Sequence, residues 1–244
     1  MVRIFFSINP DEDLEAMCGR YVRKKEGAVR LDVFDRLERR AAWRESFNVA
    51  PTMRVPVIRE SGGIREMVEM RWGLVPSWAE AGRKLPMMHN ARGEAVAKLP
   101  SFRAALRSRR CLFPASGYYE WMAGTPKVPY YFESADGGLL AFAGIWENHA
   151  EFGDTVAIVT TTPNREAGVV HDRMPVILRS EAWARWLDVE PLGDGDRGEL
   201  LQPAPDGTLI VRRVGPAVGN VRNDSEDLIK EAGRNDSPAN AELF

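Results

Sequence analysis

The residues with the clearest chemical potential are Cys18 and the methionine before it, Met17. If synthesis starts at Met17 and this methionine is trimmed, Cys18 carries a free α-amine beside its own thiol. The amine can add to an aldehyde as a Schiff base, and the thiol can then close on the same carbon as a thiazolidine, an intramolecular step. An α-amine titrates near about 8 and a lysine near about 10.4, so the α-amine is the better nucleophile at neutral pH. An internal Cys18 lacks this amine and is an ordinary small apolar residue.

Two titratable residues further along the chain suit proton transfer. Glu120 lies among aromatic residues in an otherwise apolar strand, where an ionised carboxylate is costly unless it is partnered, so we expect a raised pKa. His171 lies where a short helix is expected to meet a strand, and an imidazole titrates near neutrality. The alternative for His171 is a structural histidine. The second cysteine, Cys111, is most simply a core residue.

The composition is that of an ordinary globular protein. The 244 residues suffice for one large domain or two small ones, and 44% are hydrophobic and 28% charged. No apolar run reaches the roughly 20 residues of a membrane helix, and the first residues lack the order of a signal peptide. We therefore predict a cytoplasmic protein that does not bind membranes, and we expect a monomer. The two cysteines and three histidines include no close pair of ligands, so we expect no metal, and we expect no cofactor. A reducing cytosol argues against a structural disulfide between the two cysteines.

The charge of the chain limits how it can bind nucleic acid. A formal net charge of -2 and a pI near 6.0 argue against attraction by the whole surface, so binding must depend on a local basic patch. The most basic segment contains Arg103, Arg107, Arg109 and Arg110. A solvated face is the usual explanation of such a cluster, and contact with nucleic acid is the alternative.

The elements that must position these residues are mostly strands. Alternation and turn residues predict a strand at 18–22, a hairpin of 55–59 with 64–72, two strands on either side of a bend at Pro114, a hairpin of 128–133 with 139–146, and strands at 155–162, 176–178 and 208–214. Helical periodicity and capping residues predict helices at 31–42, at 101–108 with Ser101 as N-cap, after Asn164, and at 180–187. We expect Trp72 in the core, whereas Trp78 follows a proline in a loop and suits exposure as well as burial.

The ends of the chain differ from its middle. Residues 1–16 are acidic and aperiodic, and we expect a leader that is disordered, is removed or reflects a mis-set start. Residues 17–230 form the predicted domain, and 231–244 a flexible tail.

Seven short strings occur in a fixed order: MCGRY (17–21), FNVAPT (47–52), RWGLVPSW (71–78), NAR (90–92), YEW (119–121), AGIW (143–146) and HDRMP (171–175). Together they resemble the SOS response-associated peptidase (SRAP) family, whose members are abasic-site processing proteins. Each string alone is weak, but their order from about residue 17 to 230 is highly specific. The resemblance implies an α+β domain that is β-rich, with a twisted, largely antiparallel, barrel-like sheet flanked by short helices.

The resemblance also implies a function and roles for individual residues. Members bind single-stranded DNA in a basic channel, and an N-terminal cysteine forms a thiazolidine cross-link with the aldehyde of an abasic site. Carried over by motif, Cys18 is the nucleophile, Asn90 positions the cysteine and the sugar, Glu120 manages protons, and His171 is the acid/base partner. The implied DNA contacts are Arg20, Asn48, Pro51, Trp78 and Arg92, and the implied location is the nucleoid.

Two departures from the family pattern bear on these roles. The family has its cysteine at the second position, whereas sixteen residues precede Met17 here, which implies a mis-set start or cleavage. Relatives can carry paired tryptophans where this chain has Ser77 and Trp78, so stacking on bases is expected to be weaker.

Three other activities remain open at this point. Cys18 and His171 suit a thiol peptidase, because a peptidase needs the thiol alone, and removal of the leader is one reaction open to it. A non-catalytic single-strand binding module would not need Cys18. A Schiff base that is not closed by the thiol can instead cleave the strand as a lyase.

Overall fold

The structure is a computed structural model, and it describes residues 18–34, 36–80 and 88–233. The leader predicted at 1–16 and most of the tail predicted at 231–244 lie outside the described residues.

Strands are the main regular structure of the described residues, and they form two sheets. Their bounds are β1 (Arg20–Arg23), β2 (Glu38–Arg39), β3 (Ser46–Val49), β4 (Arg54–Ser61), β5 (Ile64–Trp72), β6 (Asn90–Arg92), β7 (Arg110–Ala115), β8 (Gly117–Met122), β9 (Val128–Ser134), β10 (Leu140–His149), β11 (Gly153–Thr161), β12 (Met174–Pro175) and β13 (Leu209–Arg213).

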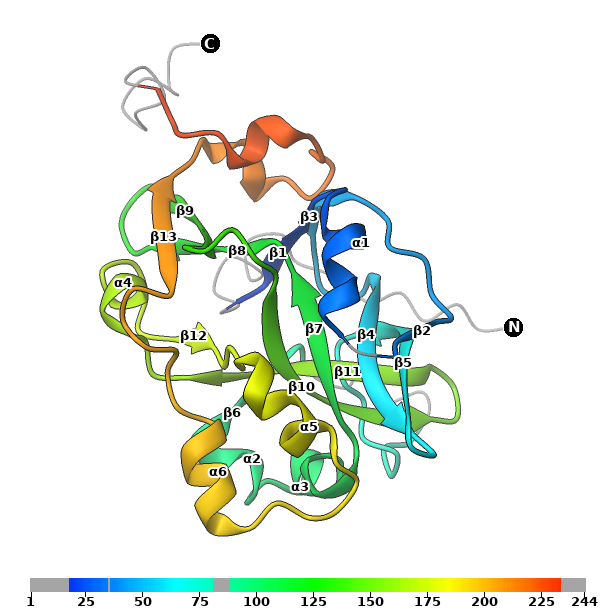
Figure 1. Ribbon diagram of the computed structural model, residues 1–244. Helices are drawn as coiled ribbons and strands as arrows, with labels where there is room; N and C mark the ends of the chain where they lie inside the picture. The colour runs from blue at the N-terminus through cyan, green and yellow to red at the C-terminus, as the bar shows by residue number, and fades with distance from the viewer. Residues whose placement is uncertain (1–17, 35, 81–87, 234–244) are drawn as a thin grey trace.

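The larger sheet closes into a barrel at the centre of the molecule (Figure 1). Its strands follow the order β12-β11-β10-β7-β4-β5-β2, and a parallel pairing joins β11 back to β5, with Val156 opposite Trp72. The ring therefore consists of β11, β10, β7, β4 and β5. Closure leaves these five strands without a free edge.

The smaller sheet has the order β13-β9-β8-β1-β3 and is antiparallel throughout. Aromatic side chains join it to the barrel. The ring of Tyr21 on β1 lies 5.5 Å from that of Trp72 on β5 and 6.5 Å from that of Phe113 on β7, both in edge contacts. All three are buried, so Trp72 is a core residue as predicted.

The helices are short and lie around the sheets. Their bounds are α1 (Gly27–Arg30), η2 (Leu31–Val33), α2 (Gly93–Val96), α3 (Pro100–Ser108), α4 (Arg165–Gly168), α5 (Ser180–Leu187), α6 (Asp194–Leu200), η3 (Pro216–Gly219) and η4 (Glu226–Ile229). Helices α2, α3, α5 and α6 gather below the barrel in Figure 1. Helix α5 buries Trp183 and Trp186 as its periodicity predicts, and the Trp186 indole donates to the Cys111 carbonyl at 2.8 Å. None of the helices in the described ranges has the length and apolar character needed to cross a membrane.

The α+β, β-rich architecture with a barrel and short flanking helices is confirmed, and so is the first hairpin. Strands β4 and β5 pair from Arg54 opposite Arg71 to Ser61 opposite Ile64. The turn residues Gly62 and Gly63 have φ of 60° and 79°, a left-handed pair that residues with a Cβ rarely adopt and that fits the twist of a two-residue hairpin.

The helix predicted at 31–42 is wrong. Its first residues form the single 3-10 turn η2, which ends at Phe34 in an extended conformation, and the chain then enters β2 beside β5. Phe34 stacks on Trp183 with ring centroids 4.1 Å apart. Burial of Phe34 against α5 and pairing of β2 with β5 therefore override a weak helical pattern.

Three further predictions need correction. The segments 128–133 and 139–146 do not pair as a hairpin, because β9 pairs with β8 and β13 whereas β10 pairs with β7 and β11. Pro114 does not mark a bend but lies within β7, opposite Ala141, and the strand β8 begins only at Gly117. The N-cap of α3 is Leu99, and Ser101 is a residue of the helix.

Candidate functional site

The site is built around Cys18, which directly precedes the smaller sheet. Strand β1 pairs with β8 in a register that puts Arg20 opposite Tyr119, and continuing this register puts Gly19, the residue after Cys18, opposite Glu120. The backbone N–H of Cys18 donates to Glu120 Oε1 at 2.7 Å. Cys18 is 2% exposed, and its φ of 47° lies in the left-handed region that residues with a side chain seldom occupy.

Glu120 is an acid in an apolar environment, as its sequence context predicts. It is 2% exposed, and burial raises the pKa of its carboxyl from the ordinary value of 4.5. The charge of His171 and the hydrogen bonds from Cys18 oppose this shift without cancelling it. The carboxyl therefore holds its proton at a higher pH than a surface glutamate does.

The thiol of Cys18 is strongly affected by the same surroundings. Burial raises its pKa well above the ordinary 9.0, the negative charge and hydrogen bond of Glu120 raise it further, and the positive charge of Arg173 lowers it. At neutral pH the sulfur is therefore a protonated thiol. Burial also raises the pKa of the neighbouring Tyr118, with added contributions from Cys18 and Glu120.

His171 reaches this site from the segment after α4. Asn164 caps that helix as predicted, because its side chain accepts the Ala167 N–H at 3.0 Å. The Nδ1 atom of His171 lies 3.1 Å from the Arg173 N–H and 3.1 Å from a carboxylate oxygen of Asp172. A neutral ring accepts from the N–H, and a protonated ring can donate to the carboxylate. Both protonation states thus have a partner.

Arg173 belongs to the site although the sequence reasoning did not select it. It is 8% exposed, its guanidinium donates to both carboxylate oxygens of Glu94 and to the Thr160 carbonyl, and its charge acts on Cys18. The hydrogen bond from Arg173 is the main cause that lowers the pKa of Glu94. The available signal was its position inside HDRMP, two residues after His171.

Strand β6 carries two more of the predicted site residues. It runs parallel to β11, with half-buried Asn90 opposite Ile158 and exposed Arg92 opposite Thr160. Thr160 also pairs with Pro175 on β12, directly after the segment that carries His171 and Arg173. The end of β11 therefore brings β6 and β12 to neighbouring positions, and the roles of Asn90 and Arg92 stay predictions.

The remaining predicted DNA contacts differ in exposure. Trp78 is 65% exposed and Pro51 is half-buried, so both side chains reach the surface. Arg20 is buried on β1. Asn48 is 1% exposed, and its amide nitrogen donates to the carbonyls of Val218, Asn220 and Asn223 at 3.2, 3.1 and 2.9 Å. A direct contact from Asn48 to DNA stays a prediction, and the contacts shown are with the chain itself.

The basic segment at 103–110 is largely engaged in the fold. Arg110 is buried and donates to the carbonyls of Trp186 and Leu106 at 2.6 and 2.7 Å. Arg109 pairs with buried Glu147. Arg103 and Arg107 alone of the four are exposed, which leaves a much smaller basic patch than the sequence indicates.

Comparisons with known proteins agree with the resemblance found in the sequence. The family model described as SOS response associated peptidase (SRAP) matches residues 17–221. The chain is 35% identical over 222 residues to the abasic site processing protein YoqW of Bacillus subtilis, covering 88% of this chain and 99% of that protein. It is 29% identical to the abasic site processing protein YedK of Escherichia coli, again covering 88% and 99%.

Solved structures share the fold. A crystal structure of a Bordetella bronchiseptica protein matches with a TM-score of 0.68 and 26% identity, covering 81% of this chain and 99% of that one. Another, from Bacteroides thetaiotaomicron, matches with a TM-score of 0.67 and 27% identity over 76% and 85%.

Proposed function

Because the chain belongs to the SRAP family, we propose that it processes abasic sites in DNA, and that it does so by covalent capture through an N-terminal Cys18. The observation that carries this proposal is the 2.7 Å contact between the Cys18 nitrogen and Glu120 Oε1. In a chain that begins at Cys18, this nitrogen is the α-amine. The carboxylate can then take a proton from the ammonium form and release the nucleophile.

The reaction is a condensation in two stages. The amine nitrogen adds to the aldehyde carbon of the ring-opened sugar, and loss of one water leaves a Schiff base. Glu120 supplies a proton to the departing oxygen, and its raised pKa keeps that proton available. The Cys18 sulfur then bonds to the same carbon, and its thiol proton passes through the Glu120 carboxylate to the imine nitrogen as the thiazolidine closes.

The raised pKa of the Cys18 thiol favours this order of steps. A protonated thiol is a poor nucleophile, so the amine reacts first and the sulfur follows once the imine carbon is held beside it. His171 has a partner for each protonation state and suits the acid/base step that opens the sugar ring. Asn90 is proposed to position the sugar.

The burial of the reacting groups favours single-stranded DNA as the partner. Cys18 and Glu120 are each 2% exposed, so the sugar must leave the helical stack to reach them. Extrusion costs least where the base is missing and no opposite strand must be unpaired. Arg20, Asn48, Pro51, Trp78 and Arg92 are the proposed DNA contacts, through phosphate pairing, packing and stacking.

The proposal requires that the working protein begin at Cys18. Intact-mass measurement of protein from its native host tests this requirement. A protein that begins at Met1 and still cross-links abasic DNA would refute the mechanism.

The central experiment uses protein that begins at Cys18 and a single-stranded oligonucleotide with one abasic site. We expect an adduct that survives denaturation and whose mass equals protein plus DNA less one water. Cys18→Ala should abolish the adduct, whereas Cys111→Ala, which removes the other buried thiol, should retain it. Asn90→Ala, Glu120→Gln and His171→Ala should slow formation or alter reversal. An undiminished adduct with Cys18→Ala would overturn the proposal.

A thiol peptidase that acts on the Met17–Cys18 bond is the second candidate. The left-handed φ of 47° at Cys18 favours it, because cleavage would release this strained conformation. Acetylation of the α-amine separates the candidates, since it blocks thiazolidine formation and leaves the thiol free. A purely non-covalent module would instead retain DNA equally with and without Cys18.

A further inference from the structure

The most exposed large aromatic side chain of the described loops lies in a segment that is anchored by buried side chains. Trp78 lies in the segment Leu74–Ala79, here called the Trp78 loop, and is 65% exposed. Both ends of the loop are buried, with Leu74 at 0% and Ala79 at 8% exposure. The Trp78 loop therefore exposes one indole to solvent while both of its ends are buried.

The anchor at the end of the loop is His149, the last residue of β10. Its ring is 3% exposed, its Nε2 lies 3.0 Å from the Ala79 carbonyl oxygen, and its Nδ1 accepts the Glu151 N–H at 3.1 Å. A carbonyl can only accept, so the proton is on Nε2 and the neutral ring has one defined tautomer. The ring also stacks on Phe152 with centroids 5.2 Å apart.

A second anchor holds the start of the loop. The Thr155 hydroxyl accepts the Val75 N–H at 3.0 Å, and Thr155 is fully buried on β11. The β10–β11 hairpin therefore fixes both ends of the Trp78 loop through side chains that reach only its backbone. Neither anchor is among the residues of the Cys18 site, and each also bonds within the hairpin, His149 to the Glu151 N–H and Thr155 to the Glu147 carbonyl.

We propose that His149 is a positioning residue for binding of single-stranded DNA, holding the Trp78 loop so that the indole forms a preorganised stacking platform for a base. This inference rests on the proposed function. Stacking of a base on an exposed aromatic ring contributes most to the binding free energy when the backbone of the ring is already fixed. Ordering a free loop on binding costs conformational entropy, which offsets that contribution.

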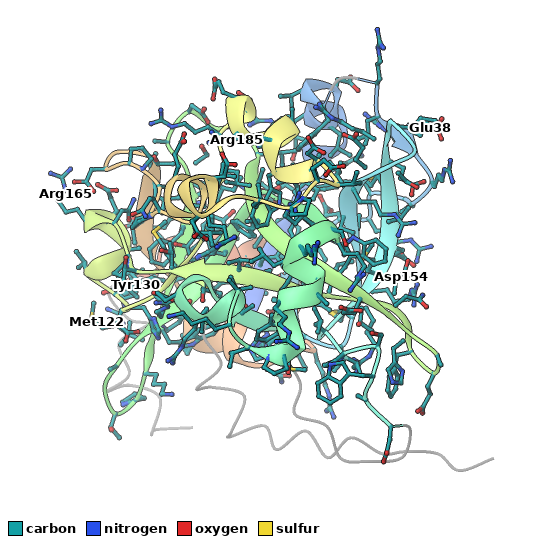
Figure 2. All side chains as sticks on the ribbon, turned by 90° about the horizontal axis from the view of Figure 1, so that it is seen from below. Glu38, Met122, Tyr130, Asp154, Arg165 and Arg185 are labelled. Atoms are coloured by element: carbon teal, nitrogen blue, oxygen red, sulfur yellow. The ribbon has the colours of Figure 1, made fainter. Side chains whose placement is uncertain are left out.

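The platform lies some distance from the reacting sulfur. Thr155 contacts the Trp78 loop and Thr160 contacts Arg173 of the Cys18 site, and five strand residues span on the order of 17 Å. Figure 2 shows that β11 crosses the molecule, with Asp154 near its start and Arg165 beyond its end on opposite sides. The base on Trp78 is thus a neighbour several nucleotides from the abasic site.

The test is a double-mutant cycle between His149 and Trp78. Binding is measured by fluorescence anisotropy of a labelled single-stranded oligonucleotide without an abasic site, at one fixed salt concentration. We expect His149→Asn and Trp78→Ala each to weaken binding roughly tenfold, because either change loses about one stacked base. In the Trp78→Ala background, His149→Asn should add less than about a twofold effect.

Two variants make the cycle specific. His149→Gln retains a donor that can reach the Ala79 carbonyl and should bind like the wild type. Asn148→Ala removes the 2.7 Å bond to Asp154 in the same hairpin without touching the Trp78 loop, and it should also bind like the wild type.

A further variant covers the case in which His149→Asn does not fold. Thr155→Val releases the other end of the Trp78 loop and should show the same coupling to Trp78.

The outcomes separate this inference from the cross-linking mechanism. Wild-type protein that binds single strands but gives no denaturation-resistant adduct would overturn covalent capture and leave the coupling measurable. Equal losses from His149→Asn with and without Trp78 would overturn the positioning role. So would unchanged binding by folded His149→Asn, or a wild type that does not bind single strands. His149→Asn should also slow cross-linking of a long abasic oligonucleotide, and this effect should disappear with a trinucleotide centred on the abasic site.

Discussion

At the scale of single residues, the candidate site combines groups that the sequence could identify with one that it could not. Glu120 was predictable because a carboxyl among aromatic residues is costly to bury and is therefore rarely a purely structural residue. Its burial and raised pKa agree with that reasoning. Arg173 was not, since only the folded chain shows that its charge acts on Cys18 while Glu94 holds the guanidinium. A sequence pattern carries no information about which partner a buried charge finds.

The raised pKa of Glu120 predicts a conflict between stability and activity. Folding raises the pKa of the Glu120 carboxyl above its ordinary value of 4.5. Stability is therefore lost as the pH rises from 4.5 through the raised pKa of the folded protein, because the folded state must then give up a proton that it binds more tightly. We expect Glu120→Gln to raise the Tm at neutral pH, by about 2–4 °C for each kcal/mol, and to slow cross-linking. The difference in Tm should vanish below about pH 4. Calorimetric scans across pH measure it.

Glu133 provides a control, because its pKa is shifted in the opposite direction to that of Glu120. Its carboxyl binds Lys24 at 2.9 Å and Arg212 at 2.6 Å, and these partners hold its pKa below the ordinary value although burial opposes them. Glu133→Gln should therefore lower the Tm at neutral pH. A Glu120→Gln variant that is also less stable at neutral pH would contradict our explanation of Glu120.

At the scale of elements, the edge strand β3 is covered by the segment that follows β13. Asn48 donates to three carbonyls of that segment, and Asp224 accepts the Phe47 N–H at 2.5 Å and the Ser46 hydroxyl at 3.2 Å. Val218 of this segment is fully buried. The sequence does not indicate that Asn48 holds this segment, because the two are far apart in the chain.

Replacement of Asn48 distinguishes this structural contact from a DNA contact. Asn48→Ala leaves buried carbonyls without their donor, and we expect a loss of about 2–3 kcal/mol in the free energy of unfolding. Hydrogen exchange should become faster at residues 218–223. Asn220→Ala, an exposed change in the same segment, should cost less than about 1 kcal/mol. Weaker DNA binding by Asn48→Ala with unchanged exchange would instead show a direct contact.

At the scale of the whole molecule, the barrel depends on close approach between its strands. Gly144 on β10 lies opposite Cys111 on β7. A Cβ at this position would lie 2.7 Å from a ring carbon of Phe113 and 2.8 Å from the Cys111 sulfur. The string AGIW marks a glycine inside a strand, which predicts a close neighbour but cannot name it.

Alanine at Gly144 therefore tests the packing of the barrel. We expect Gly144→Ala to destabilise the fold by about 1–3 kcal/mol, because the interior must move to accept a methyl group. Gly195→Ala on α6 meets no atom within 4 Å and should gain about 0.5 kcal/mol from helix propensity. Chemical denaturation measures both. Equal stability of the two variants would show that the interior is not packed as described.

The fold class was predictable at this scale, but the pairing of strands was only partly so. The hairpin of β4 with β5 followed from Gly62 and Gly63, since a tight turn determines its own register. The strands β9 and β10 have equally good turn residues between them and yet join different sheets. Which edge a strand meets is decided by burial across the whole domain, and a local pattern does not contain that information.

The parallel pairing of β5 with β11 also determines when during synthesis the protein acquires its chemistry. The cysteine leaves the ribosome first, Glu120 follows midway, and His171 emerges only after β11 is available to close the ring. If the working protein begins at Cys18, a nascent chain interrupted before β11 exposes a terminal cysteine that has Glu120 but lacks His171 and the closed barrel. We expect such a fragment to react slowly and indiscriminately with small metabolic aldehydes, in contrast to the capture of abasic DNA that we propose for the finished protein.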